Sequence, residues 1–266
     1  MALSLRIQDS GQLRPLRVLV TRPLEQALQT AAWIRRHGGE PLVFPCLRVE
    51  PCDLTALRHA CLELFRYAAI AVTSIHAVRA LLPLIPSEMP CPPIFALGHK
   101  TAAELVRYGR HAHHIVDGES ATASALAEAI VFHLGPSATG KQVLFPQASE
   151  GREELPRLLQ NAGIAVTRLA AYQTVAVEPS ALHEAVATLR AEAVDLLPIG
   201  SPRTAQVLML ALGDDAQRLL SRTLVGAIGQ TTTKALRDRE IQVDVVAESP
   251  SFEDLVSQLA LWRQQR

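Results

Sequence analysis

Aromatic residues and net charge are both scarce in this chain of 266 residues. Phe, Trp and Tyr make up 4% of it, which leaves few rings on which nucleic-acid bases could stack. Lys plus Arg equals Asp plus Glu at 26 each, so the formal net charge is zero. Such a chain is not expected to bind nucleic acid or a membrane surface through long-range electrostatics. An anionic small molecule is still allowed, because helix N-termini bind anions without charged side chains.

Cysteines are few and carry no motif. The chain has four of them, Cys46, Cys52, Cys61 and Cys91. None forms a CxxC pair, which argues against a zinc site and against the disulfide framework of a secreted protein. No apolar run approaches the length of a membrane span, and residues 1–15 look like a loose tail rather than a signal peptide. These features predict a cytoplasmic protein with reduced cysteines.

The motifs of common catalytic and cofactor sites are also absent. The chain contains no Ser-His-Asp order, HExxH, Walker loop or GxGxxG. His111, His113 and His114 lie close in sequence, but their spacing is poor for a metal and no carboxylate is near, so we interpret them as a solvated loop. Glu153 and Glu154 are interpreted as helix-start residues that favour the helix dipole. No metal or cofactor is predicted.

One pattern does occur twice. An apolar run ends at Gly229 and leads into threonines 231–233, and another ends at Gly98 and leads into Thr101. Each copy predicts a strand, a tight turn and a helix N-terminus. Such a turn leaves backbone N–H groups unpaired, with the positive end of the helix dipole behind them. The repeat suggests a two-fold arrangement in the chain.

A second pair of turns extends the repeat. Thr73-Ser74 precedes Gly98 by 24 residues, and Gly200-Ser201 precedes Gly229 by 28 residues. The hydroxyl groups in these turns could cap helices or bind a ligand, and the two roles are compatible.

Short apolar runs alternate with helical periodicity along the whole chain, which predicts an α/β protein with parallel sheets. In such sheets a ligand site lies beyond the carboxyl ends of the strands, where all four turns would sit. Arg22 and Arg152 also follow strands and could meet an anionic ligand, although solvated or salt-bridged arginines are an equal interpretation. Tyr172 lies in an extended crossing segment, where it could serve the site or pack in an interface.

With these segments in place, the chain resembles the uroporphyrinogen-III synthase family. The matching stretches run in family order within residues 17–260, and they are Val18–Pro23, Val72–Val78, Ala96–Ala102, Val143–Pro146, Gly151–Leu155, Ala171–Thr174, Ala227–Thr232 and Val246–Ser251. The segment around Gly200 departs from the pattern, because similar proteins usually have Thr or Ser there. Pro198 inside a strand is a second departure.

The resemblance implies a fold of two flavodoxin-like parallel-sheet domains joined by a two-stranded extended linker. Domain 1 would then take residues 1–43 and 174–266, the linkers residues 44–49 and 168–173, and domain 2 residues 50–167. On this division the repeated turns come one from each domain and need not be equivalent.

The resemblance also implies a reaction. Hydroxymethylbilane, a linear tetrapyrrole with eight carboxylates, would be cyclised to uroporphyrinogen III with inversion of its terminal ring, without metal or organic cofactor. The sequence itself carries no oligomerisation signal, so we expect a monomer. Tyr172 would assist departure of the hydroxyl as the catalytic residue. Substrate binding would fall to Arg22, Thr73, Ser74, Gly98, Thr101, Arg152, Ser201, Gly229, Thr231 and Thr232. The alternatives are a non-catalytic synthase-like module that binds a tetrapyrrole, and a periplasmic-type receptor, which would need a signal peptide.

Overall fold

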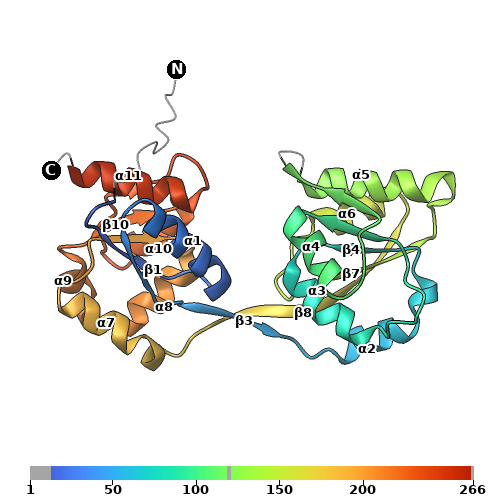
Figure 1. Cartoon of the computed structure of the whole chain (residues 1–266), viewed down its shortest axis with the longest axis horizontal. Helices are drawn as coiled ribbons and strands as arrows, with labels where there is room; N and C mark the ends of the chain where they lie inside the picture. Colours follow the sequence, from blue (N-terminus) through green and yellow to red (C-terminus); the bar gives the residue numbers. More distant parts are fainter. Residues whose placement is uncertain (1–12, 119–120, 265–266) are drawn as a thin grey trace, which may run out of the picture. The chain divides into compact units, whose positions relative to one another are not determined.

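The chain forms two compact units, which we describe from a computed structural model that covers residues 13–118 and 121–264. Unit 1 comprises Met1–Arg48 and Val175–Arg266, and unit 2 comprises Val49–Thr174. The chain passes between the units twice, outward through β3 (Leu47–Pro51) and back through β8 (Ala165–Ala176) (Figure 1). Unit 1 is therefore built from two segments that are distant in sequence.

Unit 1 contains a five-stranded sheet in the order β11-β10-β9-β1-β2. Its strands are β1 (Arg17–Val20), β2 (Glu40–Val43), β9 (Leu196–Ile199), β10 (Leu224–Ala227) and β11 (Val245–Val246). Adjacent strands pair in parallel. Counted along the unit's own chain, the order is the flavodoxin order 2-1-3-4-5, which reverses direction between β1 and β9. This switch point is where doubly wound sheets bind ligands.

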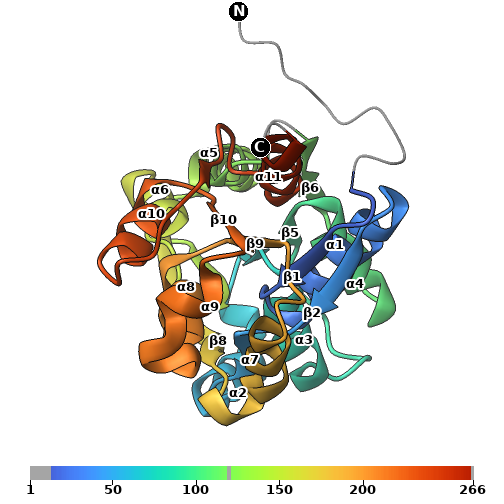
Figure 2. The same ribbon diagram turned by 90° about the vertical axis from the view of Figure 1, so that its left-hand side faces the viewer.

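Helices cover both faces of the unit 1 sheet (Figure 2). One face carries α1 (Leu24–Arg36) and α11 (Phe252–Gln264), and the other carries α7 (His183–Arg190), α8 (Pro202–Leu212), α9 (Ala216–Leu220) and α10 (Gln230–Arg237). Successive strand residues point to opposite faces. Val18 and Val20 accordingly join the core beneath α11, and Leu19 joins the core on the α8 side. A continuous apolar run is the sequence signature of a strand buried in this way.

Unit 2 contains a six-stranded sheet in the order β3-β8-β7-β4-β5-β6. Its further strands are β4 (Ala69–Val72), β5 (Ile94–Leu97), β6 (His114–Val116) and β7 (Gln142–Ala148). From β8 to β6 the strands pair in parallel. Without β3, the order along the unit's own chain is 5-4-1-2-3, the other common doubly wound arrangement, and its switch point lies between β4 and β7.

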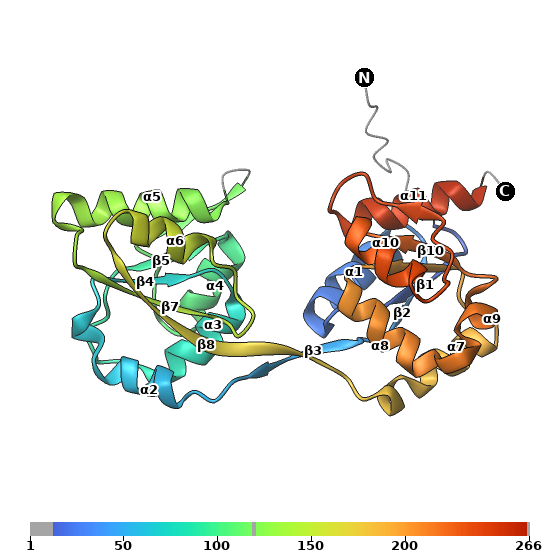
Figure 3. The same ribbon diagram turned by 180° about the vertical axis from the view of Figure 1, so that it is seen from behind.

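The unit 2 sheet is also covered on both faces (Figure 3). One face packs against α2 (Thr55–Leu62), α3 (Ile75–Leu81) and α4 (His99–Arg107), and the other against α5 (Ala123–Leu134) and α6 (Glu154–Asn161). Strand β4 divides its side chains between the two cores, with Ile70 and Val72 in one and Ala69 and Ala71 in the other. The predicted α/β class with two parallel-sheet domains is confirmed.

The structure differs from the sequence prediction at two segments. Residues 168–173, predicted as a linker, lie inside β8, which pairs with β7 as far as Tyr172. The unpaired edge of β7 accounts for this, because its backbone groups need partners. Part of the predicted tail is also ordered, since Leu13 is fully buried in the core of unit 1. Residues 1–12 of that tail lie outside the described residues.

Proline occupies a central strand of unit 1. Pro198 is buried in β9, opposite Gly226 of β10. Strand β9 pairs with β10 from Leu196 to Ile199, but it pairs with β1 only at Leu196. Proline has no N–H to donate to a ladder, which explains why the pairing with β1 stops early. The sheet thus accommodates the residue that looked out of place in the sequence.

Candidate functional site

Three of the predicted site residues line one pocket in unit 2. The pocket has a volume of about 500 Å³ and lies where β4, β5 and β7 end at their carboxyl termini. Thr73 follows β4, Arg152 precedes α6, and Tyr172 comes from β8. The lining also includes Leu97 at the end of β5 and Gln147 near the end of β7. The switch point of this sheet therefore carries a hydroxyl, a guanidinium and a phenol.

An irregularity in the sheet places Tyr172 at the pocket. The β7–β8 register runs regularly to Gln147 opposite Ala170, and then Ala148 pairs with Tyr172, so Ala171 is the extra residue. Ala171 is fully buried in the core, and Tyr172 is half-buried. A bulge of this kind changes the direction of the next side chain and is common beside active sites. The sequence alone does not reveal it.

Charges of both signs surround the pocket. Arg152 is exposed, and within the described part of the chain no ion pair or hydrogen bond holds its guanidinium. Glu150 and Glu154 line the same pocket, and Glu154 lies in the first turn of α6, where the helix dipole favours it. Arg152 is thus a cation that a ligand carboxylate could reach.

The loop after β7 requires glycine at one position. A Cβ on Gly151 would lie 2.2 Å from the terminal amide group of Gln147 and 2.9 Å from the carbonyl oxygen of Ala148. Gln147 itself is buried, and its amide oxygen, when it faces Arg168, accepts from Nε at 3.0 Å and Nη2 at 3.1 Å. Glu153 binds the same guanidinium through two contacts of 2.5 Å. Glu153 therefore fixes the loop, which the sequence did not predict.

The other predicted residues of unit 2 lie at helix starts. Ser74 caps α3, because its Oγ accepts from the backbone N–H of His76 at 3.2 Å. Gly98 precedes α4 with φ of 84°, a conformation that favours glycine. Thr101 is buried in the first turn of α4. None of these three is among the residues that line the unit 2 pocket.

In unit 1, Arg22 lies at the carboxyl end of β1. Its guanidinium carbon is 4.7 Å from the ring centroid of Phe252, and Nη1 donates to Thr30 Oγ1 at 3.1 Å. Burial lowers the pKa of Arg22, and the nearby charge of Glu253 acts in the opposite direction. The aromatic face and the hydroxyl leave part of the guanidinium's hydrogen-bonding capacity for a ligand. No local sequence pattern marks Phe252 as a partner of Arg22.

Ser201 follows β9 on the other side of the unit 1 switch point. Its Oγ accepts from the backbone N–H of Thr204 at 3.1 Å and lies 2.8 Å from Thr204 Oγ1, so it caps α8. Gly200 is in ordinary van der Waals range of Phe252, since a Cβ there would lie 3.6 Å from the ring. A small side chain at position 200 would therefore fit.

The three threonines of α10 have different environments. Thr231 is exposed, and Thr233 donates its hydroxyl to the carbonyl oxygen of Gly229 at 3.1 Å. Thr232 is 1% exposed, and its Oγ1 has no hydrogen-bond partner. Thr21, at the end of β1, is the other residue in the described ranges with a buried hydroxyl that lacks a partner. Buried polar groups are normally paired, so both hydroxyls call for an explanation.

The two repeated glycines differ in what they tolerate. Gly229 has φ of 176°, which any residue adopts, and an added Cβ meets nothing within 4 Å. Gly98, with φ of 84°, would be strained by a side chain at a cost of roughly 1–3 kcal/mol. Gly229→Ala can therefore test backbone contact with a ligand, whereas Gly98→Ala would mix that effect with strain.

We expect Gly229→Ala to fold with a loss of at most about 1 kcal/mol at the helix start. If a ligand carboxylate binds the first N–H groups of α10, the methyl group would obstruct it, and KM should rise about fivefold or more, in line with the loss of one charge-assisted hydrogen bond. The measurement is steady-state kinetics with a melting curve on the same sample. An unchanged KM would show that no ligand approaches this backbone.

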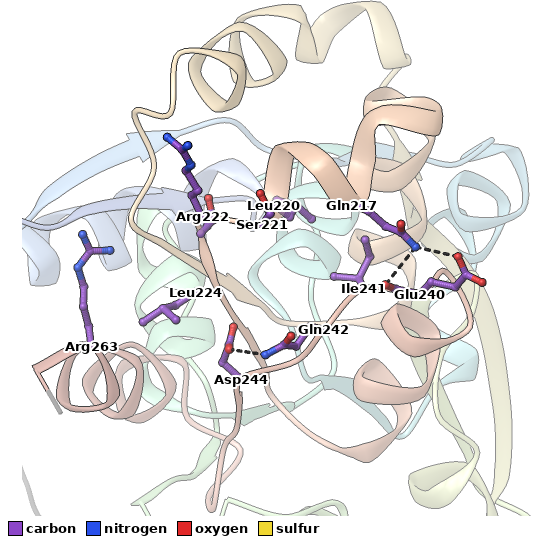
Figure 4. Close-up of a pocket in the computed structure, with 11 residues that line it drawn as sticks. Gln217, Leu220, Ser221, Arg222, Leu224, Glu240, Ile241, Gln242, Asp244 and Arg263 are labelled. Carbon is purple, nitrogen blue, oxygen red and sulfur yellow. Dashed lines mark hydrogen bonds between the residues drawn. The ribbon is translucent and has the colours of Figure 1, made fainter. Parts of the chain in front are cut away.

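A separate pocket of about 660 Å³ lies in unit 1 at the amino-terminal ends of the strands, where β10 and β11 begin (Figure 4). None of the predicted site residues lines it. Its two guanidiniums are engaged, because Arg222 pairs with Glu192 and Arg263 with Asp195. Ligand sites of open α/β sheets lie at the carboxyl ends of the strands, so we do not assign the ligand site to this pocket.

Histidines gather in unit 2 without forming a metal site. The rings of His113 and His133 have centroids 4.4 Å apart, and both lie against Phe95. Among the residues with a described position, no three His, Cys, Asp or Glu side chains are grouped so as to hold a metal ion.

Comparison with known proteins gives a consistent result. Residues 28–257 match the family described as uroporphyrinogen-III synthase HemD. The chain is 26% identical to a uroporphyrinogen-III synthase of Synechococcus elongatus, over 93% of this chain and 96% of that protein. It is 28% identical to one of Chlorobaculum parvum, over 91% of this chain and 98% of that protein.

Solved structures show the same fold. The uroporphyrinogen-III synthetase of Helicobacter pylori aligns with a TM-score of 0.54 at 19% identity, over 95% of this chain and all of that one. A mutant uroporphyrinogen III synthase of Thermus thermophilus aligns with a TM-score of 0.51 at 20% identity, over 94% of this chain and all of that one. Over residues 13–118 and 121–264, no helix has both the length and the apolar character needed to cross a bilayer.

Proposed function

Because the chain belongs to the uroporphyrinogen-III synthase family, we propose that it cyclises hydroxymethylbilane to uroporphyrinogen III, with inversion of the terminal ring and loss of water. The observation that supports this most directly is the pocket in unit 2, where Thr73, Arg152 and Tyr172 lie together at the switch point of the sheet. The non-catalytic alternative is not favoured, since the relatives that match over nearly their whole length are synthases.

The reaction requires little acid–base catalysis from the protein. An electron-rich pyrrole helps to expel the terminal hydroxide, and the proton released when the ring closes completes the molecule of water. The protein must orient the substrate so that the substituted carbon of the terminal ring attacks, rather than the unsubstituted carbon of that ring. Holding reactants in the productive geometry accelerates a reaction without strong acids or bases. The absence of a catalytic dyad in the sequence agrees with this mechanism.

We assign the predicted residues to two roles. Tyr172 donates a hydrogen bond to the departing hydroxyl. The substrate carboxylates bind Arg22 and Arg152, the backbone N–H groups that follow Gly98 and Gly229, and hydroxyl groups at helix starts. These hydroxyls belong to Thr73, Ser74, Thr101, Ser201, Thr231 and Thr232.

The test of the function is the product isomer. Purified protein is supplied with hydroxymethylbilane, and the uroporphyrinogens are separated after oxidation. Unassisted closure gives uroporphyrinogen I, so the expected result is type III in large excess over a protein-free control. A product that is type I at the uncatalysed rate would overturn the proposal. A cytoplasmic location and a monomeric state are parts of the same proposal, and the mass from sedimentation would test the second.

Thr232→Val is expected to separate binding from folding. The Thr232 hydroxyl is buried without a partner, and such a group costs about 1–3 kcal/mol, so valine should keep the melting temperature or raise it. If the hydroxyl binds a substrate carboxylate, KM should rise roughly tenfold, since a hydrogen bond to a charged group contributes about 1.5–3 kcal/mol. Thr101→Val in unit 2 should likewise raise KM.

The matched control is Thr223→Val. Thr223 is also buried in unit 1, but its hydroxyl donates to the Val194 carbonyl oxygen at 3.1 Å. Its loss should lower the melting temperature and leave KM unchanged. Wild-type kinetics for both Thr232→Val and Thr101→Val would remove these hydroxyls from the binding site.

A further inference from the structure

We propose that His76 is a positioning residue for Tyr172, holding the phenol ring in the orientation that serves the unit 2 pocket. The imidazole and phenol ring centroids are 5.3 Å apart at an interplanar angle of 46°. This tilted arrangement lies within the range of favourable aromatic contacts. The proposal rests on the proposed function, because it gives Tyr172 a part in the reaction.

His76 stands at a fixed point of the fold. It lies in the first turn of α3, and its backbone N–H donates to Ser74 Oγ at 3.2 Å. The turn from β4 into α3 thus carries Thr73 into the pocket and His76 against Tyr172. Tyr172 comes from β8, on the other side of β7 in the sheet. Two strands that are not neighbours therefore contribute to the orientation of one phenol.

A charged cluster lies near the imidazole. Glu104 of α4 is buried and binds Arg79 through Nε at 2.8 Å and Arg107 through Nη1 at 3.2 Å. The hydrogen bond from Arg79 lowers the pKa of Glu104 against the opposing effect of burial, and the charges of Arg79, Arg107 and His76 lower it further. His76 and Arg79 are three residues apart on α3, so the imidazole lies on the same helix face as the guanidinium that binds Glu104.

The positioning role of His76 follows from the way the backbone and the ring of Tyr172 are held. It is half-buried, and it follows the bulged residue Ala171 at the end of the β7–β8 pairing. Its backbone is fixed there, whereas rotation of its ring about χ1 and χ2 is limited by the side chains packed around it. A ring contact restricts that rotation, so the hydroxyl spends more of its time in the productive direction. The effect is on turnover rather than on substrate binding.

The first experiment compares His76→Ala with His76→Phe. Contacts between aromatic rings correspond to roughly a two- to tenfold change in rate, so we expect His76→Ala to lower kcat about fivefold with KM nearly unchanged. His76→Phe keeps a ring at the contact and should restore most of the turnover. His59→Ala is the control, since His59 is exposed on α2 and does not line the pocket. Wild-type kcat in His76→Ala would overturn the proposal.

The second experiment places His76→Ala in the Tyr172→Phe background. If His76 acts through the phenol hydroxyl, it should have no further effect on kcat there. An equal loss in both backgrounds would identify a merely structural role and overturn the proposal. So would a Tyr172→Phe enzyme with wild-type turnover.

A third readout does not depend on the reaction. In protein with ¹³C-labelled tyrosine, the ring resonances of Tyr172 should shift in His76→Ala and stay in place in His59→Ala. Unmoved resonances would overturn the ring contact whichever isomer the protein forms. If the resonances shift but no type III product appears, the proposed function has failed while the contact itself stands. The two failures are therefore distinguishable.

Discussion

Tyr172→Phe is expected to lower kcat by about tenfold while the protein still forms some type III product. The variant removes only the phenol oxygen and leaves the ring against His76. The phenol O–H can donate a hydrogen bond to the departing hydroxyl, but it is a weak proton donor. This is why we expect less than the roughly 10²–10³-fold loss seen when a preorganised oxyanion donor is removed.

The measurement is kcat together with the ratio of type III to type I product. Slower enzymatic closure leaves more substrate to the unassisted reaction, so the ratio should fall as kcat falls. The control is Tyr108→Phe, because Tyr108 is 40% exposed at the end of α4 and does not line the pocket. An unchanged kcat with pure type III product would remove Tyr172 from the mechanism.

Asp195→Ala is expected to cause a large loss of stability, roughly 2–3 kcal/mol in unit 1, because it removes the partner of a buried charge-assisted network. Asp195 is 8% exposed at the start of β9. Its Oδ2 accepts from the Arg17 backbone N–H at 2.8 Å and from Arg17 Nε at 3.1 Å. Its Oδ1 is 2.9 Å from Nη2 of Arg263 on α11. One carboxylate therefore links β1, β9 and α11.

Urea unfolding or a melting curve measures this loss. Asp215→Ala is the matched control, because Asp215 forms exposed ion pairs with Arg218 and Arg190. Exposed pairs contribute about 0–1 kcal/mol, so this variant should lie close to the wild type. Asp195 lies at the amino-terminal end of β9, away from the predicted site residues, so the variant should keep its activity below its melting temperature. Equal stability of the two variants would contradict the assignment.

The effect of Asp195 should depend on pH in a definite direction. Burial raises the pKa of its carboxyl, but the hydrogen bonds from the Arg17 side chain and backbone and the charge of Arg263 outweigh burial, and the pKa is lowered. A lowered folded-state pKa gives stability that is fully present above the unfolded-state pKa, near ~3.9, and is lost as the pH falls through the folded value. The gap between wild type and Asp195→Ala should thus be constant near neutrality and narrow below about pH 4.

Local sequence patterns predicted much of the fold. The apolar runs at Arg17–Val20, Ala69–Val72 and Leu224–Ala227 are strands, and each is followed by the predicted polar or glycine turn. A strand buried on both faces needs apolar side chains at every position, and this requirement is visible in sequence. The short helix α9 (Ala216–Leu220) was not predicted, because five residues are too few to show a helical period.

Local sequence was sufficient to predict which side chains stand at the carboxyl ends of the strands, because a strand's direction and the residue that follows it are properties of the chain. The positions of Thr73, Arg152, Ser201 and Gly229 just beyond the carboxyl ends of strands could therefore be predicted. Which of these residues come into contact depends instead on the packing of the folded chain. The order of strands brings Thr73 and Arg152 to one pocket, and the bulge at Ala171 adds Tyr172. Packing likewise buries the Thr232 hydroxyl and sets Arg22 over Phe252. These contacts join residues far apart in sequence, and they depend on strand pairing and core packing, which no local period records.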